Sequence, residues 1–261
     1  MRSRIAVGML SMTAMLAWSA SLTAQAPVAS ATPEPAKGGA ASPGAKKTAP
    51  PLGVVAMVDH LVYAVPDLDT GSAQVEKLLG VKPTVGGQHP GRGTRNALVG
   101  LGPTAYLEIL APDPSQPAPK KPRSFHLDEV KSPRLVGWGA HVDDLDAVVK
   151  DAAAKGIKLG DLGKGGRKRP DGVELSWRFT DPDALLGGGI VPFFIDWGES
   201  PHPAKTAPQG ATLVALRAEH PDPGTVSRIL RVLRVDMPVA RGPAPALIAV
   251  IETANGRVEL R

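Results

Sequence analysis

The sequence predicts an α+β fold made of repeated βαβββ modules. Residues 58–69 read as a strand that runs into a helix start, because strand-forming residues give way to a proline and two aspartates. The same strand-to-helix pattern returns twice, with Pro66, Asp143 and Pro221 in the equivalent place, 77 and 78 residues apart. A regular period of this length indicates duplicated modules, since it is too long for a solenoid repeat.

Module one is expected to hold one helix and four strands. The first strand leads into a helix over residues 69–79, in which Val75, Leu78 and Leu79 share one face. Gly80 is expected to end this helix. The other strands are expected near 81–85 and at 94–101 and 104–110, with a glycine-rich loop at 86–93.

Modules two and three repeat this order less regularly. For module two we expect a strand at 135–142, a helix from Leu145 that stops at Gly156, a basic loop at 163–170, and strands at 174–180 and 190–197. For module three we expect a strand at 213–218, a helix around 226–233, and strands at 246–253 and 257–260. The predicted organisation is a glyoxalase-like pair of modules over 53–199, a linker over 200–211, and a third βαβββ module over 212–261 packed on the others.

The first 26 residues have the pattern of a signal peptide. Arg2 and Arg4 precede an apolar stretch over 5–22, and Ala24-Gln25-Ala26 fits a small-x-small cleavage rule. The alternative is an uncleaved membrane anchor, but serines and threonines dilute the apolar stretch. The chain has no cysteine, which excludes a lipoprotein acceptor and disulfides. We therefore expect a periplasmic or secreted protein with no membrane span in the mature chain.

Residues 27–52 have the composition of a disordered tether. They are rich in Ala, Pro, Gly and Lys, and they hold too little apolar surface to offset the entropy of folding. The basic residues of 1–52 also account for most of the net charge of +5. The rest of the chain has 25 basic and 24 acidic residues, so its charge gives no case for nucleic acid as a partner.

Three motifs carry a family resemblance. The strand-to-helix motif Asp59-His60-Leu61-Val62-Tyr63-Ala64-Val65-Pro66-Asp67-Leu68-Asp69, the loop 89–96 followed by Tyr106-Leu107-Glu108, and the segment 196–203 together resemble the vicinal oxygen chelate superfamily. Within it, they are similar to the glyoxalase-like domain branch. The resemblance covers residues 54–261 and implies paired modules that form curved mixed sheets around a cleft.

The resemblance also implies a metal-ligand pattern. In metal-using members, a histidine on each first strand and a glutamate on each last strand bind one divalent ion. His60 and Glu108 match in module one, whereas Gly137 stands opposite His60 and Asp196 opposite Glu108 in module two. The implied set is His60, Glu108 and Asp196, with His141 as an alternative third ligand because it points to the same face as Gly137, for Zn, Mn, Fe or Ni. In module three, Glu259 aligns with Glu108.

Polar exceptions in apolar strands are the candidate site residues. His60 would otherwise be a core histidine, and Glu108 is costly to bury unless it is paired or ligated. His89 lies in a loop, where the alternative is a solvated side chain. The basic residues 164–169 are interpreted as a solvated turn, with an anion site as the alternative. We assign catalytic roles to Glu108 and His89, and substrate binding to Arg95, Asn96, Trp138 and Trp197.

Two function classes remain open from the sequence. One is a metal-assisted lyase, isomerase or dioxygenase that acts on a small oxygen-rich molecule in the intermodule cleft. The other is a metal-free protein that binds and sequesters a small molecule, as resistance proteins of this superfamily do. The metal content of the purified protein would separate them. A homodimer is a further expectation, because three modules leave one unpaired.

Overall fold

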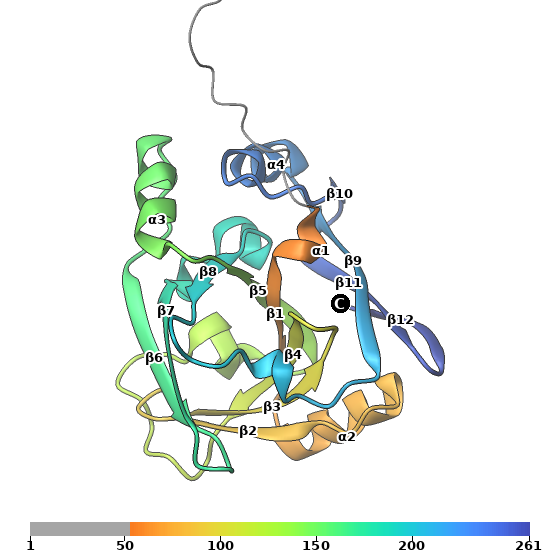
Figure 1. Ribbon diagram of the computed structural model, residues 1–261. Coiled ribbons are helices and arrows are strands. Elements are labelled where there is room, and N and C mark those ends of the chain that lie inside the picture. The colour runs from red at the N-terminus through yellow and green to blue at the C-terminus, as the bar shows by residue number, and fades with distance from the viewer. Residues whose placement is uncertain (1–52) are drawn as a thin grey trace, which may run out of the picture. The chain divides into compact units, whose positions relative to one another are not determined.

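The computed structural model describes residues 53–261 of the chain (Figure 1). The expected signal peptide (residues 1–26) and the expected tether (residues 27–52) lie outside the described residues. The described part begins with the short helix α1 (Val54–Met57), which leads directly into the first strand. Within residues 53–261, no helix has the length and apolar character needed to cross a membrane.

Module one has the expected order of elements, but the expected loop at 86–93 is wrong for residues 86–89, which belong to a strand. The Asp67 side chain caps its helix by accepting a hydrogen bond from the Thr70 backbone N–H at 2.9 Å. Gly80 ends the helix with a left-handed φ of 70°, as predicted from its position. The elements are β1 (Val58–Ala64), α2 (Leu68–Leu79), β2 (Thr84–His89), β3 (Thr94–Gly100) and β4 (Tyr106–Pro112).

Module two differs from the prediction at its basic loop and in three short helices that were not expected. The expected basic loop over 163–170 is wrong, because most of it forms the strand β6 (Leu162–Lys168), which pairs antiparallel with β7 (Glu174–Thr180). Its glycines and lysines give weak strand propensity, so pairing with β7 overrides the local signal. The other elements are η1 (Ser124–Glu129), β5 (Arg134–His141), α3 (Leu145–Ala154), η2 (Pro182–Ala184), η3 (Leu186–Gly189) and β8 (Phe193–Asp196).

The strands of modules one and two form one eight-stranded sheet in the order β2-β3-β4-β1-β5-β8-β7-β6. β1 and β5 pair antiparallel at its centre, and each runs parallel to the last strand of its own module, β4 or β8. The outer strands β2 and β6 contact each other, so the sheet curls until its edges meet (Figure 1). The expected α+β class with a curved mixed sheet is confirmed.

The third module has the expected element order but a different strand order. It contains β9 (Ala211–His220), α4 (Pro223–Val232), β10 (Val239–Arg241), β11 (Ala246–Thr253) and β12 (Gly256–Leu260), after the short helix η4 (Pro203–Lys205). Its sheet runs β10-β9-β11-β12, so its last strand lies at the edge and not beside its first strand. Glu259 on β12 is therefore not equivalent to Glu108, and it binds Arg217 at 2.6 Å on the surface.

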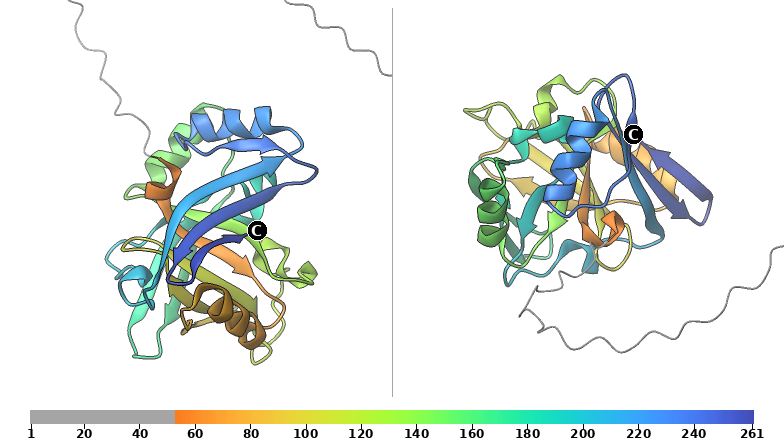
Figure 2. Two further views of the ribbon diagram at one scale, coloured as in Figure 1. Left: turned by 90° about the vertical axis from the view of Figure 1, so that its right-hand side faces the viewer. Right: turned by 90° about the horizontal axis from the view of Figure 1, so that it is seen from above.

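One hydrophobic core joins the two sheets. On the larger sheet it uses one face of the central strands, with Leu61 on β1, Leu107 on β4 and Trp138 on β5. Leu216 on β9 and Ile251 on β11 come from the smaller sheet, which lies against that face (Figure 2). Because side chains alternate along a strand, the neighbouring residues of β1 and β4 point to the other face. That second face forms the inside of the curved sheet.

Candidate active site

A cleft lies inside the curved sheet between modules one and two. It encloses about 680 Å³ of space, including its open mouth. Its lining comes from both modules, and besides the hydroxyls of Thr94 and Ser124 its polar groups belong to His60, His89, Arg92, Asn96, Glu108 and Arg167. The cleft therefore gathers one carboxylate, two imidazoles, one amide and two guanidinium groups in a space suited to a small molecule.

Aromatic side chains form the rest of the wall. The whole chain has only ten aromatic residues, and six of them line this cleft: Tyr106, Phe125, Trp177, Phe179, Phe193 and Trp197. The Trp177 and Trp197 rings lie 5.1 Å apart, and the Tyr106 ring stacks on His60 at 4.9 Å. This concentration favours a ligand with an apolar or planar part.

A β-bulge in β1 brings two adjacent polar residues to the site. Val58 pairs with Ala140 and His60 with Gly139, so Asp59 is an extra residue opposite β5. Bulges of this kind redirect side chains and often lie beside active sites. Gly139 leaves room for the imidazole, because a Cβ there would lie 2.8 Å from the Cε1 atom of His60.

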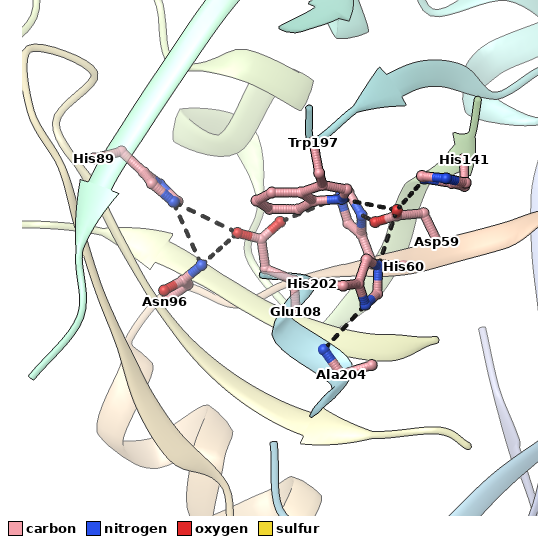
Figure 3. A network of polar contacts seen from close by, with 9 residues as sticks. All are labelled: Asp59, His60, His89, Asn96, Glu108, His141, Trp197, His202 and Ala204. Atoms are coloured by element: carbon pink, nitrogen blue, oxygen red, sulfur yellow. Dashed lines mark hydrogen bonds and ion pairs between the residues drawn. The ribbon is translucent and has the colours of Figure 1, made fainter. Parts of the chain in front are cut away.

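Asp59 is fully buried and stands at the centre of a hydrogen-bond network (Figure 3). It accepts hydrogen bonds from Trp197 Nε1 at 2.9 Å, from His202 Nε2 at 3.0 Å and from His60 Nδ1 at 2.7 Å. His141 Nδ1 lies 3.6 Å from the same carboxylate. Burial alone would raise the pKa of Asp59, but the interactions with His141, His202 and His60 outweigh it and hold the pKa well below its usual range.

The network determines which nitrogen of each histidine carries a proton. His202 Nδ1 accepts a hydrogen bond from the Ala204 backbone N–H at 3.2 Å, so its proton is on Nε2, facing Asp59. Since Asp59 is ionised, His60 donates from Nδ1 to it. The other ring nitrogen of His60, Nε2, then lies 3.8 Å from Glu108 Oε2. A carboxylate behind an imidazole in this way fixes the orientation of the ring.

The other carboxylate oxygen of Glu108, Oε1, is held by Asn96 on β3 and His89 on β2. Asn96 Nδ2 donates to Glu108 Oε1 at 2.6 Å, and His89 Nε2 lies 3.7 Å from the same oxygen. Gly86 permits this arrangement, because a Cβ at that position would lie 2.2 Å from Asn96 Oδ1. His89 Nδ1 is 2.9 Å from the Thr94 hydroxyl. Glu108 is therefore fixed between two histidines, with Oε2 directed at His60.

His89 is a neutral imidazole in this site. Burial lowers its pKa to about 4, and the charges of Arg167, Arg92 and His60 act in the same direction. Glu108 opposes this shift because a carboxylate favours the protonated ring. Both ring nitrogens of His89 face polar side chains, which suits a residue that positions Asn96 and Glu108.

The structure brings together five of the residues singled out in the sequence. His60, His89, Asn96, Glu108 and Trp197 all line the cleft. Trp197 does so while its indole N–H binds Asp59. His60, Asn96 and Glu108 converge through the alternation of side chains along β1, β3 and β4, while His89 lies at the end of β2 and Trp197 directly after β8.

Two expected substrate-binding residues are elsewhere, so these assignments are wrong. Arg95 points to the opposite face from Asn96, where it lies 3.5 Å from Asp69. Trp138 is fully buried in the core, and its indole donates to the Ile190 carbonyl at 2.8 Å. Each is one residue away from a cleft-facing position, and a single step along a strand changes the face.

Asp196 does not reach the site either. Its side chain accepts a hydrogen bond from the Gly198 backbone N–H at 2.8 Å, while its neighbours Ile195 and Trp197 line the cleft. In module one, Val62 on β1 pairs with Glu108 on β4. The residue of module two that is equivalent to Val62 is Gly139 on β5, and it pairs with Phe193 on β8. Phe193 therefore takes the place of the second carboxylate, with its ring 5.3 Å from that of His60.

The implied metal set of His60, Glu108 and Asp196 does not fit this arrangement. Two donors, His60 Nε2 and Glu108 Oε2, face each other, but the third is directed away. Among residues 53–261, no three histidine, aspartate or glutamate side chains are arranged to hold one metal ion. A protein site for a divalent ion usually needs at least three such ligands.

The roles that several residues have in the site were missed by the sequence analysis, although His141 was considered as a metal ligand and His202 as a capping or catalytic residue. Asp59 stood in the quoted motif, but its role depends on a bulge that no local pattern reveals. His141 and His202 reach Asp59 from β5 and from the segment before η4. Arg167 was interpreted as part of a solvated turn, whereas it is buried on β6. The chain has only six histidines, and four of them meet at this site. This scarcity was the one feature of the sequence that could have indicated the missed residues.

The chain belongs to the glyoxalase-like domain family, whose model matches residues 58–233. This places it in the vicinal oxygen chelate superfamily, as the motifs indicated. A search of curated proteins gave no match.

One solved structure shows a similar fold, and two others match with lower scores. A hypothetical protein from Staphylococcus aureus is 14% identical, with 76% of this chain and 91% of that chain covered and a TM-score of 0.56. Methylmalonyl-CoA epimerase from Mycobacterium tuberculosis is 24% identical, covering 56% and 91%, with a TM-score of 0.37. The Streptomyces coelicolor epimerase with 2-nitronate-propionyl-CoA is 19% identical, covering 56% and 98%, with a TM-score of 0.40. The likeness to the Staphylococcus aureus protein concerns the fold alone, and nothing is argued from the two epimerases.

Proposed function

We propose that the chain binds a small carbonyl compound in the cleft and moves a proton at the carbon next to the carbonyl, as an isomerase or lyase. The observation that carries the proposal is the facing pair of His60 Nε2 and Glu108 Oε2, 3.8 Å apart on the wall of an aromatic cleft. A base for carbon acids needs a fixed acceptor and a second group that can take the proton on, and the Glu108 carboxylate and the free Nε2 of His60 supply both.

The chemistry follows from the positions of the two groups. Glu108, fixed by Asn96, takes the proton from carbon, and the electron pair of the broken C–H bond moves to the carbonyl oxygen to give an enolate. His60, oriented by Asp59, exchanges that proton with Glu108. Returning the proton to the same or another carbon completes an isomerisation, and loss of a β-leaving group completes a lyase reaction.

A divalent ion (Zn, Mn, Fe or Ni) is not assigned a step in this proposal. His60 and Glu108 would be its protein ligands, and the described residues provide no third. Treatment with EDTA is therefore a separate arm of the test below. Loss of activity on chelation, with recovery on adding one ion, would favour the metal-assisted class.

Replacing Glu108 with glutamine is expected to abolish proton exchange while leaving the fold intact. The assay follows deuterium exchange at C1 of 2-tetralone, a neutral ketone fused to a benzene ring, by proton NMR in D₂O. We expect exchange above the buffer rate for the wild type and a loss of about 10²–10⁴-fold in Glu108→Gln, because general base catalysis contributes this much. Glu259→Gln is the matched control, since Glu259 is an exposed glutamate outside the cleft. Equal rates in both variants would refute the proposal, as would no exchange by the wild type.

Metal-free binding without chemistry is the second candidate. It is favoured by the six aromatic residues that line the cleft, which suit a protein that holds a planar molecule. It predicts tight binding by both the wild type and Glu108→Gln, with no exchange by either. The exchange assay and a binding measurement together separate the two candidates.

We also propose that the protein is exported to the periplasm or secreted, with cleavage after Ala26, as the N-terminal pattern indicates. The intact mass of the protein from its native host tests this, and a chain that retains Met1 would contradict it. A homodimer remains a proposal for light scattering to test. The smaller sheet already packs on the larger one within the chain, so dimerisation is not required to cover it.

A further inference from the structure

Arg167 is a buried cation at the edge of the cleft. It lies on β6, and only 5% of its surface is exposed. Its guanidinium donates one hydrogen bond, from Nη1 to the Gly86 carbonyl on β2. That contact joins the two outer strands where the curved sheet closes. A structural reading would assign Arg167 only this role.

The charge of Arg167 is not neutralised by the protein. No carboxylate of the described residues lies within 4.0 Å of its guanidinium, whereas Arg178 binds Asp146 at 2.8 Å. An arginine has five N–H donors. Apart from the bond to Gly86, those of Arg167 have no partner among residues 53–261, and the side chain lines the cleft. A buried charge left without a partner is unfavourable, so a bound anion would stabilise it.

The surrounding charges leave room for one anion. Burial lowers the pKa of Arg167, while Tyr106 and Glu108 oppose that shift, so Glu108 is the carboxylate most strongly felt by it. Glu108 is already bound to Asn96 and faces His60. Arg92, the second cation of the cleft, stacks on Phe179 at 4.8 Å. Its charge is offset in part by Asp183 and Asp181. Arg167 is therefore the cation of the cleft whose N–H groups are available to a bound anion.

We infer that the cleft takes an aryl-substituted carboxylate, with the carboxylate on Arg167 and the ring among Trp177, Trp197 and Phe179. The planar fork of a guanidinium matches a carboxylate through two parallel hydrogen bonds. The tilted pair of indoles, 5.1 Å apart, supplies an apolar surface in the same cleft. This inference rests on the proposed function, since it names the substrate class of that same site.

Calorimetry with a matched pair of ligands tests it. 3-Phenylpropionate and 3-phenylpropionamide have the same ring and chain and differ by one negative charge. The full-length wild type is expected to bind the carboxylate at least about tenfold more tightly, since a charge-assisted hydrogen bond contributes that much. Arg167→Gln should remove this preference and leave binding of the amide within about twofold. Arg178→Gln, which changes an exposed arginine outside the cleft, should bind like the wild type.

Three outcomes would overturn the inference. Equal affinity of the wild type for both ligands would show that charge has no role. An equal loss of both ligands in Arg167→Gln would show that Arg167 only closes the sheet. No binding of either ligand would exclude the substrate class. The proposed function is tested separately, because Glu108→Gln is expected to keep carboxylate binding while losing exchange on the neutral 2-tetralone.

Discussion

Replacing Asp59 with asparagine is expected to lower the free energy of unfolding by about 3–5 kcal/mol, the range for losing one partner of a buried charged network. It should also reduce proton exchange about 10²–10⁴-fold, since an unoriented imidazole is a poor acid–base partner. Asparagine keeps the size of the side chain but loses the charge that three histidines and Trp197 share. Chemical denaturation and the 2-tetralone assay measure the two effects.

Asp143→Asn is the matched control for this change. Asp143 is fully exposed and contacts only the outer side of His141 at 3.3 Å. We expect its stability to stay within about 0.5 kcal/mol of the wild type. If Asp59→Asn were equally mild in stability and in exchange, the Asp59 network would not support the site.

The contribution of Asp59 is expected to be constant at neutral pH. Its pKa in the folded state is lowered, so its stabilisation is fully present above the unfolded value of about 3.9. That stabilisation is lost only as the pH falls through the folded-state pKa. The contribution of His141 to stability depends on pH in the opposite direction, because Asp59 raises the pKa of His141. Its contribution is present below about pH 6.5 and disappears as the pH rises through the raised value.

His89 is expected to make the protein less stable in mild acid. The pKa of His89 is lowered to about 4 in the folded state, whereas it is about 6.5 in the unfolded chain. In the pH range between these two values, the unfolded chain binds the proton and the folded protein does not. Lowering the pH from about 7 to about 4.5 should therefore remove about 2 kcal/mol of stability through this residue. The groups that face it are Glu108, which favours the proton, and Arg167, Arg92 and His60, which oppose it.

His89→Gln isolates this effect. Denaturant unfolding of the wild type and the variant at both pH values gives two differences, and the wild type should lose about 2 kcal/mol more. His126→Gln is the control, since His126 is exposed and pairs with Glu129 on the surface. The interpretation fails if the wild type and His89→Gln show the same pH dependence.

The fold could be predicted because its signals are local. The strand formers of β1, the proline after it, the Asp67 cap and the terminating Gly80 all act within a few residues. The repetition of these local signals along the chain indicated the duplicated modules. The strand order of module three could not be predicted, because it depends on whether β9 pairs with β10 or with the last strand. That choice is made by non-local pairing.

The candidate site could be predicted only in part, for a similar reason. His60, Asn96 and Glu108 are polar residues on otherwise apolar strands, and burial makes such residues conspicuous. Arg95 and Trp138 were assigned to the wrong face, which a sequence without a known register cannot resolve. Asp59 depends on a bulge, and Arg167 depends on the closure of β6 against β2, so each needs the assembled sheet.

The most direct test of the central claim is the protonation of His60, measured by imidazole ¹⁵N NMR of the wild type without ligand. The claim is that Asp59 holds His60 so that Nε2 is presented to Glu108. We predict a proton on Nδ1 that is protected from solvent and lost or shifted in Asp59→Asn, and an Nε2 resonance that shifts in Glu108→Gln. An unprotonated Nδ1, or an Nε2 resonance unchanged in Glu108→Gln, would contradict it.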